Sequence, residues 1–304
     1  MVSKATGKIL RFIYMKTFDF SQMLGFHVTR VHYYSPLPDT RVLTRKPELW
    51  SRELSLDGLN LNIDGQKSLV EAIWKFFHHE YMDFPLERTN NPTEYYLNNG
   101  SFGFVSGQMH YGMIRYFKPK RVIEIGAGYS TLVSIAGLVK NAEEGYDCEF
   151  TTIDPHPSSF IQKVMPSNQL ITQRVEDIDI GFFDCLSNND MLFIDSSHTV
   201  KIGGDVNFLI LEVLPRLKKG VIVHIHDIQF PYEYFKTYAL EQHMFWQEQY
   251  LVQAFLAYNY AFRILWCASY MHYKYHDMMT QCFSPYPESR VPTSLYIQKI
   301  REQE

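Results

Sequence analysis

From residue 121 onward, short apolar segments alternate with helical ones, and this alternation constrains the fold more than any other feature of the chain. The apolar segments lie at 122–125, 150–153, 170–175, 191–194 and 221–225, and helices are expected at 131–139 and 205–217. Almost wholly apolar strands separated by helices are typical of a parallel sheet that is covered on both faces. Two more strands are expected near the end of the chain, at 262–267 and 294–298, after a helix at 241–258. The pattern predicts a doubly wound α/β fold.

The turn after the first of these strands is rich in glycine and reads Glu-Ile-Gly-Ala-Gly-Tyr-Ser-Thr over residues 124–131. Gly126 and Gly128 can adopt backbone angles that other residues avoid, so the chain can turn tightly and approach a ligand closely. The next helix is expected to begin near Ser130 and Thr131, where free backbone amides can face the same ligand, and Tyr129 and Ser130 are candidate cofactor-binding residues. This segment therefore predicts a site for a nucleotide-type cofactor.

Acidic residues near the glycine turn distinguish between cofactors. Glu124 lies in the strand itself, where a carboxylate would repel a pyrophosphate but attract the sulfonium and ammonium groups of S-adenosylmethionine. A dinucleotide site would also have a third glycine, where this chain has Thr131, and an acid about 20 residues further on. Asp154 instead ends the second strand and could accept hydrogen bonds from ribose hydroxyls. We therefore favour S-adenosylmethionine, with an NAD(P)-dependent oxidoreductase and a non-catalytic nucleotide-binding protein as alternatives.

The runs RVIEIGAGYST, TTIDP, MLFIDSSH, GVIVHIHDI and TSLYIQK together resemble class I S-adenosylmethionine-dependent methyltransferases. The likeness is greatest to the methyltransferase-24 group, which includes O-methyltransferases of secondary metabolism, and it extends over about 109–300. It implies a mostly parallel, seven-stranded Rossmann-like sheet with an antiparallel last strand. It also implies that Glu124, Gly126, Gly128 and Asp154 bind the cofactor, with Asp177 near the adenine.

Four polar residues follow two neighbouring strands of the predicted sheet. Asp195 and His198 come after 191–194, and His226 and Asp227 come after 221–225. The carboxyl ends of parallel strands meet at the ligand crevice of such a sheet, so these side chains are expected to converge on the cofactor and the methyl acceptor. A histidine here could act as a general base. Alternatively, Asp195 and Asp227 could bind a divalent metal such as Mg²⁺, which the resemblance allows, or all four could be structural.

The acceptor is expected to contact segments outside the common core. Residues 1–108 are interpreted as an N-terminal extension that forms a lid or a homodimer interface, and 109–304 as the catalytic domain. The candidate acceptor-binding residues are aromatic or imidazole side chains: Tyr33, Tyr34, His110, Tyr111 and Trp246. We expect O-methylation of a hydroxyl or carboxylate on a small molecule or sugar.

Composition and charge argue against several other partners. The formal net charge of −4, with both signs interspersed, provides no cationic surface for nucleic acid. The four cysteines are scattered without a CxxC pair, which indicates reduced thiols and a cytoplasmic protein. The most apolar long stretch, 251–271, contains Arg263 and is therefore interpreted as a buried helix and strand instead of a membrane span.

Overall fold

The computed structural model describes residues 4–283 and 286–302 and divides into two compact units. The smaller unit comprises Met1–Ser51 and Phe235–Phe245. It contains helices α1 (Lys4–Met23) and α2 (Thr40–Thr44), the 3-10 helix η1 (Pro47–Trp50) and α9 (Lys236–Leu240), and α2 packs on α9. The larger unit comprises Arg52–Tyr234 and Trp246–Glu304 and holds the whole sheet.

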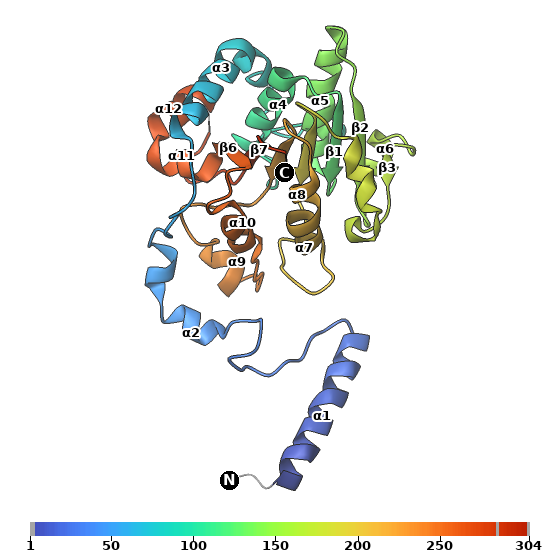
Figure 1. The fold of residues 1–304 in the computed structure, drawn as a ribbon, viewed down its shortest axis with the longest axis vertical. Coiled ribbons are helices and arrows are strands. Elements are labelled where there is room, and N and C mark those ends of the chain that lie inside the picture. Colours follow the sequence, from blue (N-terminus) through green and yellow to red (C-terminus); the bar gives the residue numbers. More distant parts are fainter. Residues whose placement is uncertain (1–3, 284–285, 303–304) are drawn as a thin grey trace. The chain divides into compact units, whose positions relative to one another are not determined.

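The sheet of the larger unit has seven strands in the order β3-β2-β1-β4-β5-β7-β6. Strands β2 and β6 lie on opposite sides of this sheet (Figure 1). The strands are β1 (Arg121–Ile125), β2 (Glu149–Ile153), β3 (Leu170–Ile171), β4 (Met191–Ile194), β5 (Ile222–Ile225), β6 (Phe262–Cys267) and β7 (Leu295–Lys299). Strand β7 is antiparallel to both of its neighbours, whereas the other neighbouring pairs are parallel. The predicted doubly wound, mostly parallel α/β fold is confirmed. The third predicted strand is shortened to two residues and is followed by the 3-10 helix η2 (Val175–Asp177).

Alternating side chains of the strands supply two apolar layers, one on each face of the sheet. Val122, Met191 and Phe193 pack into one layer, and Ile123 and Ile125 into the other. The helices that contribute to the first layer are α3 (Ile63–Tyr81), α4 (Ser106–Phe117), α5 (Tyr129–Glu143), α11 (Ala268–Lys274) and α12 (His276–Phe283), with α6 (Ile161–Val164) near β3. Those of the second layer are the 3-10 helix η3 (Ile180–Cys185), α7 (Asp205–Asn207), the π-helical η4 (Phe208–Val213), α8 (Leu214–Arg216) and α10 (Glu248–Leu256). None of the described helices is long and apolar enough to cross a membrane.

The division of the chain differs from the predicted boundary near residue 108. Residues 52–108 belong to the larger unit, because α3 packs against α4 and β6 and buries Val70, Ile73 and Tyr81 in the core. The Gln66 side chain ties this helix to the sheet by accepting a hydrogen bond from the backbone of Cys267, at 2.8 Å. The helix predicted at 241–258 is also shorter, since α10 begins at Glu248 and the segment before it joins the smaller unit.

Arg115 connects three helices inside the larger unit. Its guanidinium is 2% exposed, lies 2.8 Å from Glu80 of α3 and also contacts Asn141 and Glu144 at α5. Arg115→Ala leaves Glu80 without its counter-charge, so we expect the free energy of unfolding to fall by about 3 kcal/mol. Arg121→Ala, which breaks the exposed pair with Glu149 at 3.0 Å, is the matched control and should cost less than about 1 kcal/mol. Urea denaturation of both variants measures the change in the free energy of unfolding. Equally small decreases in the two variants would contradict the structural role of Arg115.

Candidate active site

The glycine turn joins β1 to α5 and approaches the loop after β4. Gly126 has a φ of +81°, and a Cβ atom at this position would overlap the backbone oxygen of Asp195. A Cβ atom at Gly128 would meet nothing within 4 Å. Thr131 fixes the turn by accepting a hydrogen bond from the Gly128 amide at 3.0 Å. The turn is thus tightly packed at its first glycine and open at its second.

Glu124 is fully buried beside this turn. Ser130 donates a hydrogen bond to Oε1 at 2.5 Å, whereas Oε2 has no hydrogen-bond partner among the residues that the structure describes. Burial raises the pKa of Glu124 to about 8, although hydrogen bonds from Ser130 and Thr131 act in the opposite direction. A buried carboxylate with an unused oxygen is electrostatically suited to a cationic group.

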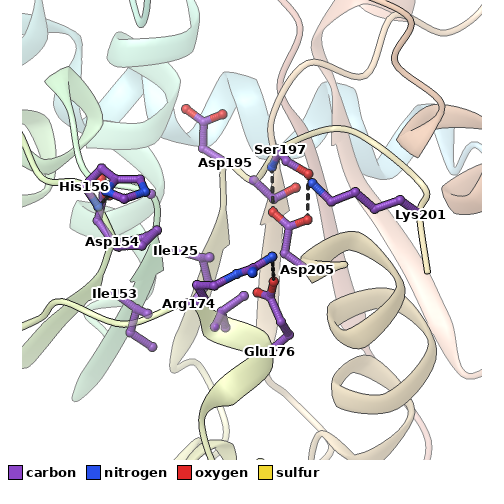
Figure 2. Close-up of a pocket in the computed structure, with 14 residues that line it drawn as sticks. Ile125, Ile153, Asp154, His156, Arg174, Glu176, Asp195, Ser197, Lys201 and Asp205 are labelled. Atoms are coloured by element: carbon purple, nitrogen blue, oxygen red, sulfur yellow. Dashed lines mark hydrogen bonds and ion pairs between the residues drawn. The ribbon is translucent and has the colours of Figure 1, made fainter. Parts of the chain in front are cut away.

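A cavity of about 460 Å³ lies at the carboxyl ends of β1, β2 and β4 (Figure 2). Asp154 lines it and is oriented by the backbone, since its two oxygens accept hydrogen bonds from Ala127 at 3.0 Å and His156 at 2.7 Å. An ion pair between Arg174 and Glu176, at 2.7 Å, lines another part of the wall. The other residues that line the cavity are Ile125, Gly126, Ile153, Pro155, His156, Val175, Asp195, Ser196, Ser197, Lys201 and Asp205.

Asp177, which the resemblance places near the adenine, is exposed and does not line this cavity. Its neighbours Val175 and Glu176 line the wall instead. The reason is local: β3 ends after two residues, and the following 3-10 turn directs Val175 inward and Asp177 outward.

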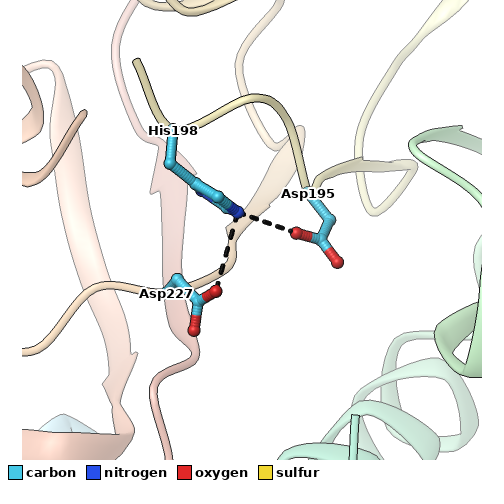
Figure 3. Close-up of side chains that lie close together, drawn as sticks. All are labelled: Asp195, His198 and Asp227. Atoms are coloured by element: carbon cyan, nitrogen blue, oxygen red, sulfur yellow. Dashed lines mark ion pairs between the residues drawn. The ribbon is translucent and has the colours of Figure 1, made fainter. Parts of the chain in front are cut away.

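Three of the predicted polar residues converge where β4 and β5 end (Figure 3). The Nε2 atom of His198 lies 3.3 Å from Oδ1 of Asp195 and 3.6 Å from Oδ2 of Asp227. His198 and Asp227 both have a φ of +56°, a left-handed conformation that non-glycine residues adopt rarely and that recurs at functional sites. Thr293 holds Asp227 by donating a hydrogen bond to its Oδ1 atom at 2.8 Å.

Glu248, at the start of α10, is a fourth member of this cluster that the sequence did not reveal. It is fully buried, its Oε2 atom lies 2.8 Å from Nδ1 of His198, and its Oε1 atom accepts a hydrogen bond from Ser196 at 3.1 Å. Burial raises the pKa of Glu248, and the hydrogen bond with His198 partly offsets this rise. Nothing in the local pattern of residues 241–258 distinguishes this glutamate from a solvent-facing one, because its partner is 50 residues away in sequence.

Burial and charge act in opposite directions on the acids and bases of the cluster. Burial alone would lower the pKa of His198, but its hydrogen bonds with Asp195 and Glu248 outweigh this effect and keep the pKa well above the ordinary value. Burial would raise the pKa of Asp195, yet the nearby His226 and His198 leave it lowered. The cluster therefore favours ionised groups of both signs.

The neighbouring histidines form a buried stack that leads away from the cluster. His226 is 6% exposed, and its Nε2 atom lies 3.8 Å from Asp227. Its ring stacks on that of His224, in β5, at a centroid distance of 5.5 Å. His224 in turn stacks on Phe193 at 4.0 Å, inside the core.

The predicted acceptor-binding residues are spread over different environments. Trp246 lies against His198, with ring centroids 4.4 Å apart. His110 is completely buried and hydrogen-bonded to Tyr296 and Ser134, both at 2.8 Å. Tyr111 is 3% exposed and donates to Glu80 at 2.7 Å. His110 and Tyr111 are thus placed in the core instead of at an acceptor surface. Tyr33 and Tyr34 belong to the smaller unit and are each 80% exposed.

The fold is that of a class I methyltransferase, of the Rossmann-like α/β type. Three features define it: the sheet order with its single antiparallel strand, the glycine turn after β1, and the acid after β2. Residues 123–228 match the family model of a methyltransferase domain. This match confirms the predicted likeness to methyltransferases over that part of the chain.

Individual proteins are also similar to this chain. An uncharacterized protein of Archaeoglobus fulgidus is 29% identical over 165 residues, which are 52% of this chain and 73% of that protein. The methyltransferase PaMTH1 of Podospora anserina, solved with bound S-adenosylhomocysteine, is 14% identical, with a TM-score of 0.40 over 88% of this chain and 99% of its own. Human N-acetylserotonin methyltransferase in complex with S-adenosylmethionine is 12% identical, with a TM-score of 0.28 over 65% of this chain and 52% of its own.

Proposed function

We propose that this protein transfers the methyl group of S-adenosylmethionine to an oxygen of its acceptor. The acceptor is a small molecule or a sugar, and the oxygen belongs to a hydroxyl or a carboxylate. The observation that supports this most is Glu124, a buried carboxylate with an unused oxygen beside the open Gly128. These features fit a ligand with a cationic amino-acid end. Asp154, in the adjoining cavity, would accept hydrogen bonds from ribose hydroxyls.

S-adenosylmethionine, when bound, supplies a methyl group that is already activated by the positive charge on sulfur. The protein then has to align the acceptor oxygen with that methyl group and, where the acceptor is a hydroxyl, remove its proton. As the new O–C bond forms, the C–S bond breaks and S-adenosylhomocysteine leaves. His226 is the stronger candidate for receiving the proton, because both ring nitrogens of His198 already face carboxylates. The acceptor would be oriented by Asp195, His198 and Asp227, and Trp246 would form one wall of the acceptor site.

A second candidate role for Asp195 and Asp227 is to bind a divalent cation. Together with His198 they offer three ligand atoms that all lie within 4.8 Å of one another, so the donor set fits such an ion. When bound, the ion would orient the acceptor oxygen and lower its pKa.

Two further expectations stay predictions. One is that the N-terminal residues form a lid or a homodimer interface, and the other is that the protein is cytoplasmic.

The test of the proposed function is calorimetric titration of the 304-residue chain with S-adenosylmethionine, S-adenosylhomocysteine and NAD(P)H. We expect binding of the first two in the micromolar range and no binding of NAD(P)H. Binding of NAD(P)H alone would favour the oxidoreductase alternative. Folded protein that binds neither sulfur compound would contradict the proposal, whereas binding without turnover of any acceptor would favour a non-catalytic protein.

Asp154→Asn should weaken the binding of both sulfur compounds by tenfold or more. The variant keeps the size of the side chain but removes the charge that strengthens hydrogen bonds to ribose hydroxyls. Asp177→Asn is the matched control, because Asp177 is exposed and outside the cavity, and its affinity should stay within twofold of the wild type. Equal effects of the two substitutions would show that the cavity at Asp154 is not where the adenosine binds.

A further inference from the structure

A second cavity, of about 220 Å³, lies beside β6, the strand at one edge of the sheet. Its lining residues come from 58–62, 256–264 and 300–301, all within the larger unit. Strands β5 and β6 are both antiparallel to β7, so β6 runs in the same direction as the parallel strands. The cavity borders the beginning of β6 and the two residues that follow β7. This β6-edge cavity is therefore at the amino ends of the parallel strands, opposite to the proposed cofactor cavity at their carboxyl ends.

The β6-edge cavity carries positive charge that its own wall does not balance. Arg263 and Arg301 line it, whereas none of the described lining residues is acidic. Neither guanidinium forms an ion pair or a hydrogen bond with the part of the chain that the structure describes. Glu302, next to Arg301, instead accepts a hydrogen bond from the backbone amide of Lys219 at 3.2 Å. A cavity lined by charge of one sign attracts ions of the opposite sign, and the guanidinium fork matches phosphate and carboxylate groups.

Two tyrosines that line the cavity offer ring faces to a ligand. Tyr258 is 71% exposed and Tyr260 is 65% exposed. Tyr258 has a φ of +57°, a left-handed conformation that is rare for a bulky side chain. Its backbone amide donates to the carbonyl oxygen of Gly58 at 2.8 Å, and a Cβ atom at Gly58 would come within 2.8 Å of its ring. Strained residues of this kind cluster at ligand sites, where the surrounding structure imposes the conformation.

Asparagine side chains hold the wall of the cavity and add hydrogen-bonding groups to it. The Nδ2 atom of Asn62 donates to the carbonyl oxygen of Ile264 at 2.8 Å, and Oδ1 of Asn60 accepts from the backbone amide of Asn62 at 3.0 Å. Oδ1 of Asn62 and Nδ2 of Asn60 have no hydrogen-bond partner among the described residues. An amide oxygen and an amide nitrogen can bond the hydroxyl groups of a ligand. Ring faces, amides and cations thus line one preformed cavity.

We propose that the β6-edge cavity binds a small sugar that carries a phosphate or a carboxylate group. The two arginines would bind the anion, and the tyrosine rings would pack on the apolar faces of the sugar ring. The asparagine side chains would bond its hydroxyl groups. This inference does not rest on the proposed function, because the two cavities lie at opposite ends of the parallel strands.

The experiment is a calorimetric titration of the 304-residue chain with glucose 6-phosphate, glucuronate, glucose and inorganic phosphate. We expect at least one of the two sugar anions to bind with a Kd of about 1 mM or lower. Glucose and inorganic phosphate should bind at least tenfold more weakly, and NaCl should weaken the binding of the sugar anion because it screens the arginines. Folded protein that binds neither sugar anion would overturn the proposal. Inorganic phosphate that binds as tightly as glucose 6-phosphate would overturn the recognition of a sugar ring.

Substitutions locate the binding in the β6-edge cavity. Arg263→Ala and Arg301→Ala should each weaken the binding of the sugar anion by at least tenfold, and Arg263→Lys, which keeps the charge without the fork, should weaken it less. Tyr258→Asn, which removes the ring but tolerates the left-handed backbone, should also weaken it. Arg52→Ala is the matched control, because Arg52 is exposed and outside the cavity, and it should bind as the wild type does.

Urea denaturation of the same variants separates loss of the site from loss of folding. Each variant should unfold at a urea concentration close to that of the wild type, because the substituted side chains are exposed. Binding of the sugar anion that folded Arg263→Ala and Arg301→Ala both retain would place the ligand elsewhere and overturn the proposal.

Discussion

Glu124→Gln is expected to stabilise the cofactor-free protein and, at the same time, to weaken its binding of S-adenosylmethionine. Burial raises the pKa of Glu124 to about 8, so the folded protein holds a proton that the unfolded chain releases near pH 4.5. The wild type should therefore lose stability as the pH rises from about 4.5 to about 8, by roughly 1.4 kcal/mol per unit of pH and about 3–5 kcal/mol in all. The glutamine cannot ionise and avoids this loss.

Urea denaturation of the free protein at pH 6 and pH 8.5 measures this effect. The stability advantage of Glu124→Gln should be larger at pH 8.5, where the wild-type carboxylate is ionised and buried. Glu149→Gln, on a side chain that is 71% exposed, is the control and should change little at either pH.

The binding half of the prediction follows from the charge of the ligand. A cationic group beside Oε2 of Glu124 would stabilise the ionised carboxylate, so binding should release a proton below pH 8 and tighten as the pH rises. Glu124→Gln should then bind S-adenosylmethionine at least tenfold more weakly and lose this dependence on pH. A variant that is less stable at both pH values and binds the cofactor normally would show that Glu124 has only a structural role.

Gly126→Ala is expected to abolish cofactor binding, whereas Gly128→Ala should fold as the wild type does. The added methyl group at Gly126 would overlap the backbone oxygen of Asp195 at a φ of +81°, which alanine rarely adopts. The turn or the loop after β4 must therefore move, and both border the proposed cofactor cavity. We expect at least a hundredfold loss of S-adenosylhomocysteine affinity, measured by calorimetry.

Gly128 supplies the matched control because it lies in the same turn and has open space around its Cα atom. Its φ of −162° is extended backbone that any residue adopts. Gly128→Ala should change the free energy of unfolding by less than about 1 kcal/mol. If a cofactor occupies the open space, the variant should still bind it more weakly. Wild-type affinity in Gly126→Ala would refute the placement of the cofactor at this turn.

Features that depend on local pattern could be predicted from the sequence. Apolar runs defined six of the strands to within about one residue, and the shift from strand to helix around Gly126 located the turn. The convergence of Asp195, His198 and Asp227 was also predictable, since the ends of adjacent parallel strands must meet at one edge of a sheet. Each of these inferences uses residues close together in sequence or a general rule of sheet topology.

Features that depend on contacts between distant segments were decided by the tertiary structure. The burial of Glu248 against His198 joins residues 50 positions apart, and the core position of His110 depends on its hydrogen bond with Tyr296, 186 positions away. The assignment of residues 52–108 to the larger unit likewise depends on packing against β6. The sequence alone determined the sheet, the glycine turn and the acids at the strand ends, because periodicity and backbone preference are local. Only the tertiary structure decided which buried groups complete the site. Long-range packing removes some polar side chains from water, and these side chains must then find partners within the protein.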